Sequence, residues 1–168
     1  MRLLREWRRV ARSIGVRRDR CGLVALLLVA GGCGSFDRAW NAARQAPAES
    51  AASPIAGQWI GTWRSDVNGH HDQLRCLVVS GTDQILSARF HARYKKAFLR
   101  FSFGYAVPLT IRTNDARIEF AGEADLGWYA GGTYRYRGFA TATNFYSTYD
   151  SKYDHGVFRL QRPAAVQE

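Results

Sequence analysis

From residue 57 onward, apolar and polar positions alternate along the chain with a period of two. In the longest run, every second residue from Phe101 to Ile111 is large and apolar, and the residues between them are mainly small or polar. Successive side chains of a β-strand point to opposite faces, so such a run predicts a strand with one buried and one wet face. Runs of this kind cover residues 59–63, 74–78, 86–94, 101–111, 118–124, 134–138, 145–147 and 156–160.

Turn-forming residues separate these runs, among them Asn68-Gly69, Asn114-Asp115 and Gly131-Gly132. These residue types favour tight turns, because Gly and Asn tolerate a left-handed backbone and Asn and Asp bond to nearby amides. No segment shows a clear helical period over three turns. Residues 57–162 are therefore predicted to be all-β, with antiparallel neighbours joined by short connections.

The length of this region limits its architecture. Residues 57–162 number 106, and eight strands of about ten residues with loops of about three residues need roughly 100. This suits an antiparallel up-and-down β-barrel of about eight strands, whose closure removes exposed sheet edges. A two-sheet β-sandwich fits the length nearly as well, but it needs longer crossing connections than the sequence offers.

The N-terminal segment has a different pattern. Eight arginines and only two acidic residues, Glu6 and Asp19, occupy the first 20 positions, and a 13-residue apolar stretch follows at 21–33. A basic start, a short apolar core and small residues at its end are the parts of a secretory signal peptide. As a helix the apolar stretch would be about 20 Å long, too short for the roughly 30 Å hydrocarbon core of a bilayer. Residues 1–32 are predicted to be the signal peptide.

The end of the apolar stretch, Val29 to Cys33, resembles the lipobox of bacterial lipoproteins. The resemblance implies that Cys33 carries a lipid and becomes the first residue of an exported, membrane-anchored chain. Ala30 and Gly31 depart from the commonest lipobox residues, and the alternatives are an ordinary cleaved signal or an uncleaved N-terminal anchor. By the same resemblance, Gly34 in place of Asp favours the periplasmic face of the outer membrane, in a cell that has one.

Residues 33–56 follow the predicted cleavage site and are rich in Ala, Ser and Pro after Arg44. This composition predicts a flexible linker behind the lipidated cysteine, because it offers too little apolar surface to offset the entropy of ordering. A short helix over Phe36–Arg44 is the alternative. Residues 163–168, after the barrel region, are predicted to be a disordered tail.

The charge balance argues against a nucleic acid partner. The formal charge of the whole chain is +10, but the segment before Cys33 holds eight basic and only two acidic residues. From Cys33 onward, sixteen basic residues face twelve acidic ones, a balance that is ordinary for a small soluble domain. One basic cluster could meet an anionic lipid surface or form a solvated strand face. It comprises Arg89, Arg93, Lys95, Lys96 and Arg100.

The cysteines do not predict a disulfide. Cys21 leaves with the signal peptide and Cys33 is taken by the lipid, so Cys76 remains alone. Cys76 lies between Leu74 and Val78 in an alternating run and is predicted to be a small core residue rather than a nucleophile.

The first predicted strand begins Gly57-Gln58-Trp59, which resembles the Gly-x-Trp start of the calycin superfamily of lipocalins, fatty-acid-binding proteins and avidins. The resemblance covers this strand and the meander pattern after it. It implies a calycin-like barrel in which Trp59 lies across the floor and Gly57 allows a close approach of the chain. A late arginine packed over the tryptophan would strengthen it, and Arg159 and Arg162 are both placed for that role.

Aromatic residues are plentiful for so small a barrel. Their apolar bodies and polar tips suit a pocket for a small apolar or amphipathic ligand, and they equally suit a filled core. Trp128 and Tyr129, in a glycine-rich loop, are predicted to form an exposed rim or a partner contact. The candidate ligand-binding residues are Trp63, Phe90, Tyr94, Phe103, Tyr105, Phe120, Tyr134 and Tyr136.

His71, Asp154 and His155 are the candidates for a metal site or acid–base chemistry. In a barrel of sequential hairpins, the loop after the first strand and the loop before the last open at the same end. Imidazole and carboxylate groups there would suit Zn²⁺ or general acid–base catalysis. No established zinc-ligand spacing is present, and polar turn residues are the simpler interpretation. His91 alternates with basic residues and is predicted to lie on the wet face.

Three functions remain open from the sequence. The first is a membrane-tethered lipoprotein whose barrel binds a small apolar or amphipathic ligand. The second is a lipoprotein with a filled barrel that is structural or binds another protein, and the third is an enzyme that uses the histidine and aspartate rim. No cofactor is expected, and the lipid anchor makes a membrane the expected partner.

Overall fold

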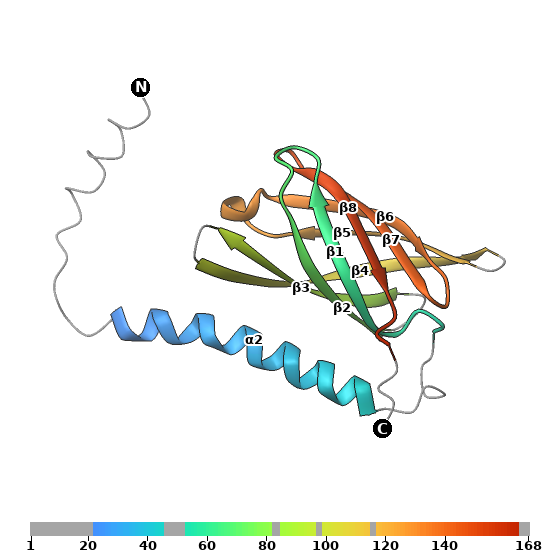
Figure 1. Cartoon of the computed structure of the whole chain (residues 1–168), viewed down its shortest axis with the longest axis horizontal. Helices are drawn as coiled ribbons and strands as arrows, with labels where there is room; N and C mark the ends of the chain where they lie inside the picture. The colour runs from blue at the N-terminus through green and yellow to red at the C-terminus, as the bar shows by residue number, and fades with distance from the viewer. Residues whose placement is uncertain (1–21, 46–52, 82–84, 97–98, 115–116, 165–168) are drawn as a thin grey trace. The chain divides into compact units, whose positions relative to one another are not determined.

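Eight strands form a closed barrel in the computed structural model (Figure 1). The structure describes residues 22–45, 53–81, 85–96, 99–114 and 117–164. A helix, α2 (Gly22–Gln45), precedes the barrel, and a short 3₁₀ helix, η2 (Trp128–Ala130), lies between the fifth and sixth strands. The strands are β1 (Gly57–Ser65), β2 (His71–Ser80), β3 (Ile85–Lys96), β4 (Leu99–Asn114), β5 (Arg117–Asp125), β6 (Thr133–Ala140), β7 (Asn144–Asp150) and β8 (His155–Gln161).

Pairing of the first and last strands closes the barrel. Each strand pairs antiparallel with the next one along the chain. β1 also pairs with β8, from Ile60 opposite Gln161 to Ser65 opposite Gly156. The prediction of an all-β, antiparallel up-and-down barrel of eight strands is confirmed. The alternative of two separate sheets is excluded, because the ladder continues from β8 into β1.

The alternating pattern fits the barrel wall, because each strand places every second side chain inside the barrel. All eight apolar runs fall inside the eight strands. In β7 and β8 every second residue is buried, and the residues between are exposed or half-buried. The inward-facing residues of these two strands are Phe145, Ser147, Tyr149, Gly156, Phe158 and Leu160.

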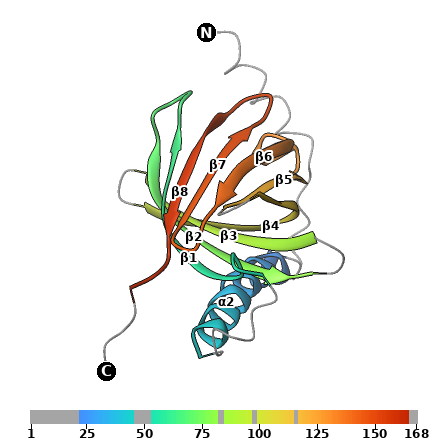
Figure 2. The same cartoon turned by 90° about the vertical axis from the view of Figure 1, so that its right-hand side faces the viewer.

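The two ends of the barrel differ. One end, called the floor here, holds the start of β1, the end of β8 and residues 53–56. The other end, called the rim, holds the connections from β1 to β2, from β5 to β6 and from β7 to β8 (Figure 2). The pairing places the turns at 66–70 and 151–154 side by side at the rim, as the sequence predicted.

Residues 33–168 form one compact unit, and residues 1–32 form another. Most of the predicted signal peptide, residues 1–21, lies outside the described residues, and export therefore stays a prediction. Among the residues that the structure describes, no helix combines the length and the apolar character needed to cross a membrane.

The structure corrects the predicted flexible linker at 33–56. Residues 33–45 are helical, as the second part of α2, so the alternative of a helix over Phe36–Arg44 is confirmed. Phe36 is 4% exposed, and Ile55 is fully buried at the floor. Composition misses this order because the barrel side chains that cover Phe36 are Arg75 and His91, which lie on the outer face that the alternation predicts to be wet. Residues 46–52 and, in the predicted tail, 165–168 lie outside the described residues.

Candidate functional site

The floor of the barrel is closed by a tryptophan and an arginine. The Trp59 side chain is fully buried, and its indole N–H donates to the carbonyl oxygen of Ile55 at 2.9 Å. The Arg162 guanidinium carbon lies 3.9 Å from the centre of the Trp59 ring. Of the two arginines that the calycin resemblance offered, Arg162 packs over the tryptophan, whereas Arg159 is exposed on the outer wall.

The middle of the barrel is filled by aromatic rings. Phe90 from β3 lies 6.0 Å from the Tyr136 ring of β6 and 5.3 Å from the Phe158 ring of β8. These distances join ring centres from strands on different sides of the barrel, so the rings meet across its axis. Nearer the floor, Phe145 stacks on Phe120 with ring centres 4.6 Å apart. At this level the rings leave no room for a ligand, since centre distances of 4.5–7 Å are those of direct aromatic contact.

A glycine on β6 makes room for this packing. A Cβ atom at Gly138 would lie 2.0 Å from the Tyr146 carbonyl oxygen and 2.9 Å from the Phe120 ring. Any larger residue there would have to displace the neighbouring backbone and the ring. The absent side chain is therefore part of how the filled interior fits.

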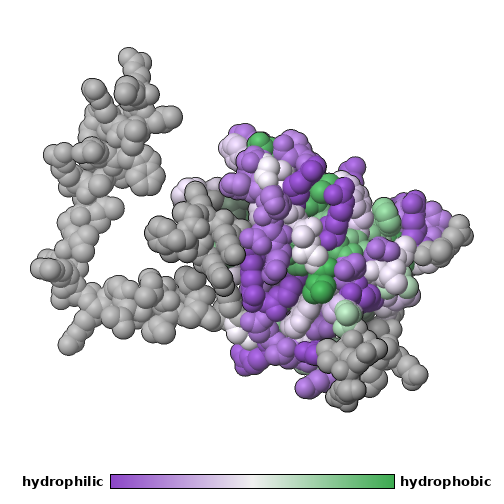
Figure 3. Space-filling model, viewed as in Figure 1, coloured by the Kyte–Doolittle hydropathy of each residue, from purple (hydrophilic) through white to green (hydrophobic). Residues whose placement is uncertain are grey.

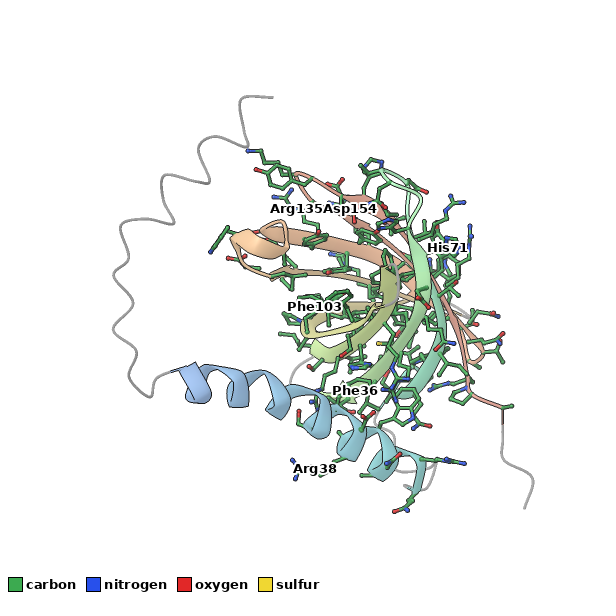
Figure 4. All side chains as sticks on the ribbon, turned by 60° about the vertical axis from the view of Figure 1, so that its left-hand side comes forward. Phe36, Arg38, His71, Phe103, Arg135 and Asp154 are labelled. Atoms are coloured by element: carbon green, nitrogen blue, oxygen red, sulfur yellow. The ribbon has the colours of Figure 1, made fainter. Side chains whose placement is uncertain are left out.

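The predicted ligand-binding residues divide between this core and the rim side of the barrel. Phe90, Phe120 and Tyr136 are buried in the core. The Tyr94 side chain lies outside the described part. Phe145, Tyr149 and Phe158 are also buried in the interior but are missing from that predicted set; strand alternation alone places all three inward. The partly buried members nearer the rim are Trp63, Phe103, Tyr105 and Tyr134 (Figure 4 labels Phe103).

Three interior phenols have raised pKa values. The Tyr105 and Tyr136 rings are stacked with centres 6.1 Å apart, and burial raises the pKa of both hydroxyl groups above the usual tyrosine value. Burial also raises the pKa of Tyr149, with a further contribution from the neighbouring Asp154 carboxylate. All three stay protonated near neutral pH, because desolvation disfavours the phenolate. They act as polar members of a packed core.

At the rim, Asp154 joins the two neighbouring turns (Figure 4). Ser65 is 1% exposed, and its hydroxyl donates to the Asp154 carboxylate at 2.6 Å. The Tyr149 hydroxyl donates to the same carboxylate at 3.3 Å, and the backbone amide of Asp66 donates to the carbonyl of His155 at 2.9 Å. These hydrogen bonds link the β1–β2 turn to the β7–β8 turn, and we call this group of residues the structural clasp.

The predicted metal or acid–base set does not assemble at this clasp. His71 and His155 are exposed, and His71 Nδ1 lies 3.1 Å from the carbonyl of Gly69 in its own turn. Within the described ranges, no three His, Cys, Asp or Glu side chains could hold a metal ion together. The geometry supports the simpler interpretation, in which polar residues stabilise the turns.

A cleft opens on the outer side of the rim, beside η2. It has a volume of about 540 Å³ and lies between η2, the start of β6 and the β7–β8 turn. Trp128 at 91% exposure and Tyr153 at 65% exposure offer aromatic surface to it. Its polar lining residues are Thr133, Arg135, Asp150, Ser151 and Lys152.

The loop that carries Trp128 needs glycine on both sides of η2. Gly127 before η2 and Gly131 after it have φ values of 82° and 98°, a backbone region that favours glycine. The sequence predicted an exposed aromatic here, and Trp128 confirms it; the Tyr129 side chain lies outside the described part. Tyr153 was missed as its companion, because the pairing of β7 with β8 is needed to bring it to the same cleft.

A second cluster fixes the part of α2 after residue 33 on the outer face of β2 and β3. The Phe36 ring stacks on the His91 ring with centres 4.9 Å apart. The Arg75 guanidinium lies 5.0 Å from the Phe36 ring centre and 5.3 Å from that of Trp40. Asp37 and Arg75 form an ion pair at 2.8 Å. Figure 4 shows Phe36 on the barrel side of the helix and Arg38 on its far side.

The cluster corrects the prediction for His91. Its side chain does point outward from β3, but α2 covers it, and it is 4% exposed. Arg75 Nη2 lies 3.2 Å from His91 Nδ1; since arginine has no acceptor, the imidazole nitrogen accepts and the ring is neutral. Burial, and then the charges of Arg75 and Arg93, lower the His91 pKa below its usual value, while Asp37 opposes this.

Cys76 has the place in the core that the sequence predicted, and lipid attachment at Cys33 stays a prediction. Cys76 is buried and free of disulfide bonds, and burial raises the pKa of its thiol well above the usual value. A buried neutral thiol is a poor nucleophile, so Cys76 is a core residue, as predicted. Cys33 lies in α2, three residues before Phe36.

Comparison with known protein families, with curated proteins and with solved structures gives no match. The face of the molecule in Figure 3 is mainly hydrophilic, with small hydrophobic areas among the polar ones. Among the described residues, the aromatic cleft at the rim brings exposed aromatic and charged side chains together in one place.

Proposed function

We propose that this protein is an exported lipoprotein, anchored to a membrane through Cys33, whose filled barrel presents a binding cleft for a small amphipathic ligand. The observation that carries the binding role is the cleft of about 540 Å³ beside Trp128 and Tyr153. Because aromatic rings occupy the middle of the barrel, the ligand binds at the rim rather than inside. The periplasmic face of the outer membrane is the proposed location in a cell that has one.

The lining of the cleft indicates the chemistry of the ligand. A flat apolar group would stack on the indole of Trp128 or the phenol of Tyr153. An anionic group would be attracted to Arg135 and Lys152, although Asp150 in the lining and Glu123, 3.1 Å from Arg135, offset part of that charge. Most binding pockets combine apolar walls with a few polar groups that fix the orientation of the ligand. A planar molecule with one acidic group fits this lining best.

The proposal is tested with 1-anilinonaphthalene-8-sulfonate, which joins flat aromatic rings to a sulfonate. Residues 34–168 belong to one compact unit and can be prepared without the anchor. We expect the dye to bind and its fluorescence to rise, and Trp128→Ala to weaken binding about tenfold or more, since a stacked aromatic contributes about 0.5–1.5 kcal/mol beyond its buried area. Tyr153→Ala should have a similar effect.

Phe101→Ala is the matched control, because Phe101 is an exposed aromatic that does not line the cleft. This variant should bind the dye as the parent protein does. Absence of binding, or binding that Trp128→Ala leaves unchanged, would contradict the proposed site.

A contact with another protein is the second candidate. The nearly complete exposure of Trp128 favours it, because tryptophan is enriched in the centres of protein interfaces. Cross-linking from a photoreactive residue at position 128 in intact cells separates the candidates. A discrete protein adduct favours a protein partner, and its absence together with dye binding favours the small ligand.

A further inference from the structure

The positive charge of the barrel is concentrated in one hairpin. From Ile85 to Asn114, the segment that forms β3 and β4, the chain carries six basic residues and no acidic one. Residues 57–80 carry two of each, and residues 117–161 carry five of each. We call β3 and β4 the basic hairpin. It is the positive side of a barrel that is otherwise balanced.

The docked helix runs toward this hairpin in the direction of Cys33. At Trp40 the helix lies over β1, where Gln58 Nε2 donates to the Trp40 carbonyl at 2.7 Å. One turn earlier, Phe36 stacks on His91 of β3. Going back along α2 therefore leads from β1 across β2 to β3, and the next strand in the wall is β4.

Cys33 lies close to the docked part of the helix. It precedes Phe36 by three residues within α2, which is about 4.5 Å of helix at 1.5 Å per residue. Only Gly34 and Ser35 separate the two, so there is no long tether between the proposed lipid and the barrel. A lipid on Cys33 would bring the barrel to within a short distance of the membrane, with the basic hairpin on that side.

We propose that the outer face of the basic hairpin rests on the anionic surface of the membrane that holds the Cys33 lipid. This inference rests on the proposed lipid attachment. The barrel then has one fixed orientation, with α2 and the basic hairpin toward the lipid headgroups and β5 to β8 away from them.

Charge and distance both favour a lipid surface as the partner. Basic residues near an anionic membrane surface contribute about 1 kcal/mol each, and the attraction falls off within a Debye length of about 8 Å at physiological salt. The short link from Cys33 to Phe36, which contacts His91 of β3, keeps the adjoining part of the hairpin near the lipid surface. Arg93 is exposed and Arg89 is half-buried on the outer face of β3. One lipid chain gives only marginal binding, and a basic patch is a common second contribution.

The first test measures which face of the barrel approaches the membrane. The full chain, processed in a bacterium, is reconstituted into vesicles of phosphatidylcholine and phosphatidylglycerol that carry a headgroup nitroxide quencher. A fluorophore is attached at Ser102→Cys, opposite Arg93 on β4, or at the control position Thr148→Cys, opposite Arg137 on β7. Buried Cys76 should not react. We expect strong quenching at position 102 and retained emission at position 148.

The second test removes charge. Arg89→Gln with Arg93→Gln should lower the ratio of surface-bound to free barrel about 30-fold, because two basic residues no longer face anionic lipid. Arg137→Gln with Arg159→Gln, on the balanced side, is the control and should leave quenching unchanged. Replacing phosphatidylglycerol with phosphatidylcholine should lower the quenching at position 102 at least as much as the first pair does, because it removes the attraction of every basic residue of the hairpin.

The outcomes separate this inference from the proposed function. Equal quenching at positions 102 and 148, or quenching that ignores both lipid charge and the arginine pair, would overturn the proposed orientation while leaving the anchor intact. A chain that does not associate with vesicles of either composition would instead disprove the lipid anchor, and the orientation with it.

Discussion

The Arg162 guanidinium lies 3.9 Å from the centre of the Trp59 ring and joins the end of the barrel to its beginning. It also donates to the carbonyl oxygens of Pro54 and Ala56, each at 2.8 Å. These bonds satisfy backbone groups that precede β1 and therefore have no partner in the barrel ladder. One side chain thus covers the indole and orders the segment that enters the barrel.

Arg162→Lys should lower the free energy of unfolding by about 2–4 kcal/mol, because lysine keeps the charge but cannot reproduce the planar fork that bonds several carbonyls at once. Chemical denaturation of the purified protein measures this. Arg159→Lys, on the exposed outer wall, is the control and should stay within about 0.5 kcal/mol of the parent. If Arg162→Lys lowers the free energy of unfolding as little as Arg159→Lys does, the contact between Arg162 and the floor is not needed for stability.

Phe36→Ala should release α2 from the barrel. Phe36 is buried between Arg75 and His91, and truncation of a buried phenylalanine costs about 3–5 kcal/mol. Amide hydrogen exchange should quicken over residues 34–45, while the barrel strands stay protected. Arg38→Ala, on the far side of the helix, should leave the exchange pattern as it is; unchanged protection of residues 34–45 in the Phe36 variant would mean that the helix does not depend on this contact.

The docked helix should be sensitive to acid. The His91 pKa is lower in the folded protein than the usual unfolded value of about 6.5, so the unfolded chain binds a proton that the folded one resists. The contribution of neutral His91 to the free energy of unfolding is fully present above pH 6.5. It is lost as the pH falls from 6.5 to the pKa of His91 in the folded protein, and it does not change further below that pH. The free energy of unfolding is measured for the parent and for His91→Gln between pH 7.5 and 4.5, an interval around the pKa of free histidine. The two curves should converge as the pH falls. Parallel curves would exclude this histidine as the cause.

Asp154→Ala should destabilise the rim by about 1–3 kcal/mol, since it leaves the buried Ser65 hydroxyl without its acceptor. His71→Ala, an exposed member of the same predicted set, should have little effect on thermal unfolding. This contrast separates a structural clasp from a metal site. If Zn²⁺ stabilised the parent protein and His71→Ala abolished that effect, the interpretation as a clasp would be wrong.

Alternation along the chain was enough to predict the barrel, because an up-and-down barrel repeats one local rule in every strand. The same rule placed Phe90 and Tyr136 inward, but it left open whether their rings meet. That depends on which strands face each other across the axis, and Phe90 contacts Phe158 from the last strand. Whether the rings fill the interior depends on how the barrel closes and on the register of its strands. The pattern within a single strand does not reveal either of them.

Prediction failed where order comes from contacts between distant segments. Phe36 and Trp40 are two aromatic residues in a stretch that otherwise looks like a tether, and their docking site on Arg75 and His91 looks like a solvated strand face. The cleft is similar, because Trp128 and Tyr153 come from two turns that only the barrel pairing brings together. The basic cluster, in contrast, could be identified from the sequence, because the residues of the hairpin that carry it are contiguous in the chain.

We propose that a lipid on Cys33 anchors this chain to a membrane, and the intact mass of the protein purified from bacterial membranes measures that modification. We expect a chain that begins at Cys33 and carries the added mass of a lipid, and Cys33→Ser should abolish that species. A mass that matches an unmodified polypeptide, or a chain whose first residue is not Cys33, would show that this protein is not anchored through a lipid on Cys33.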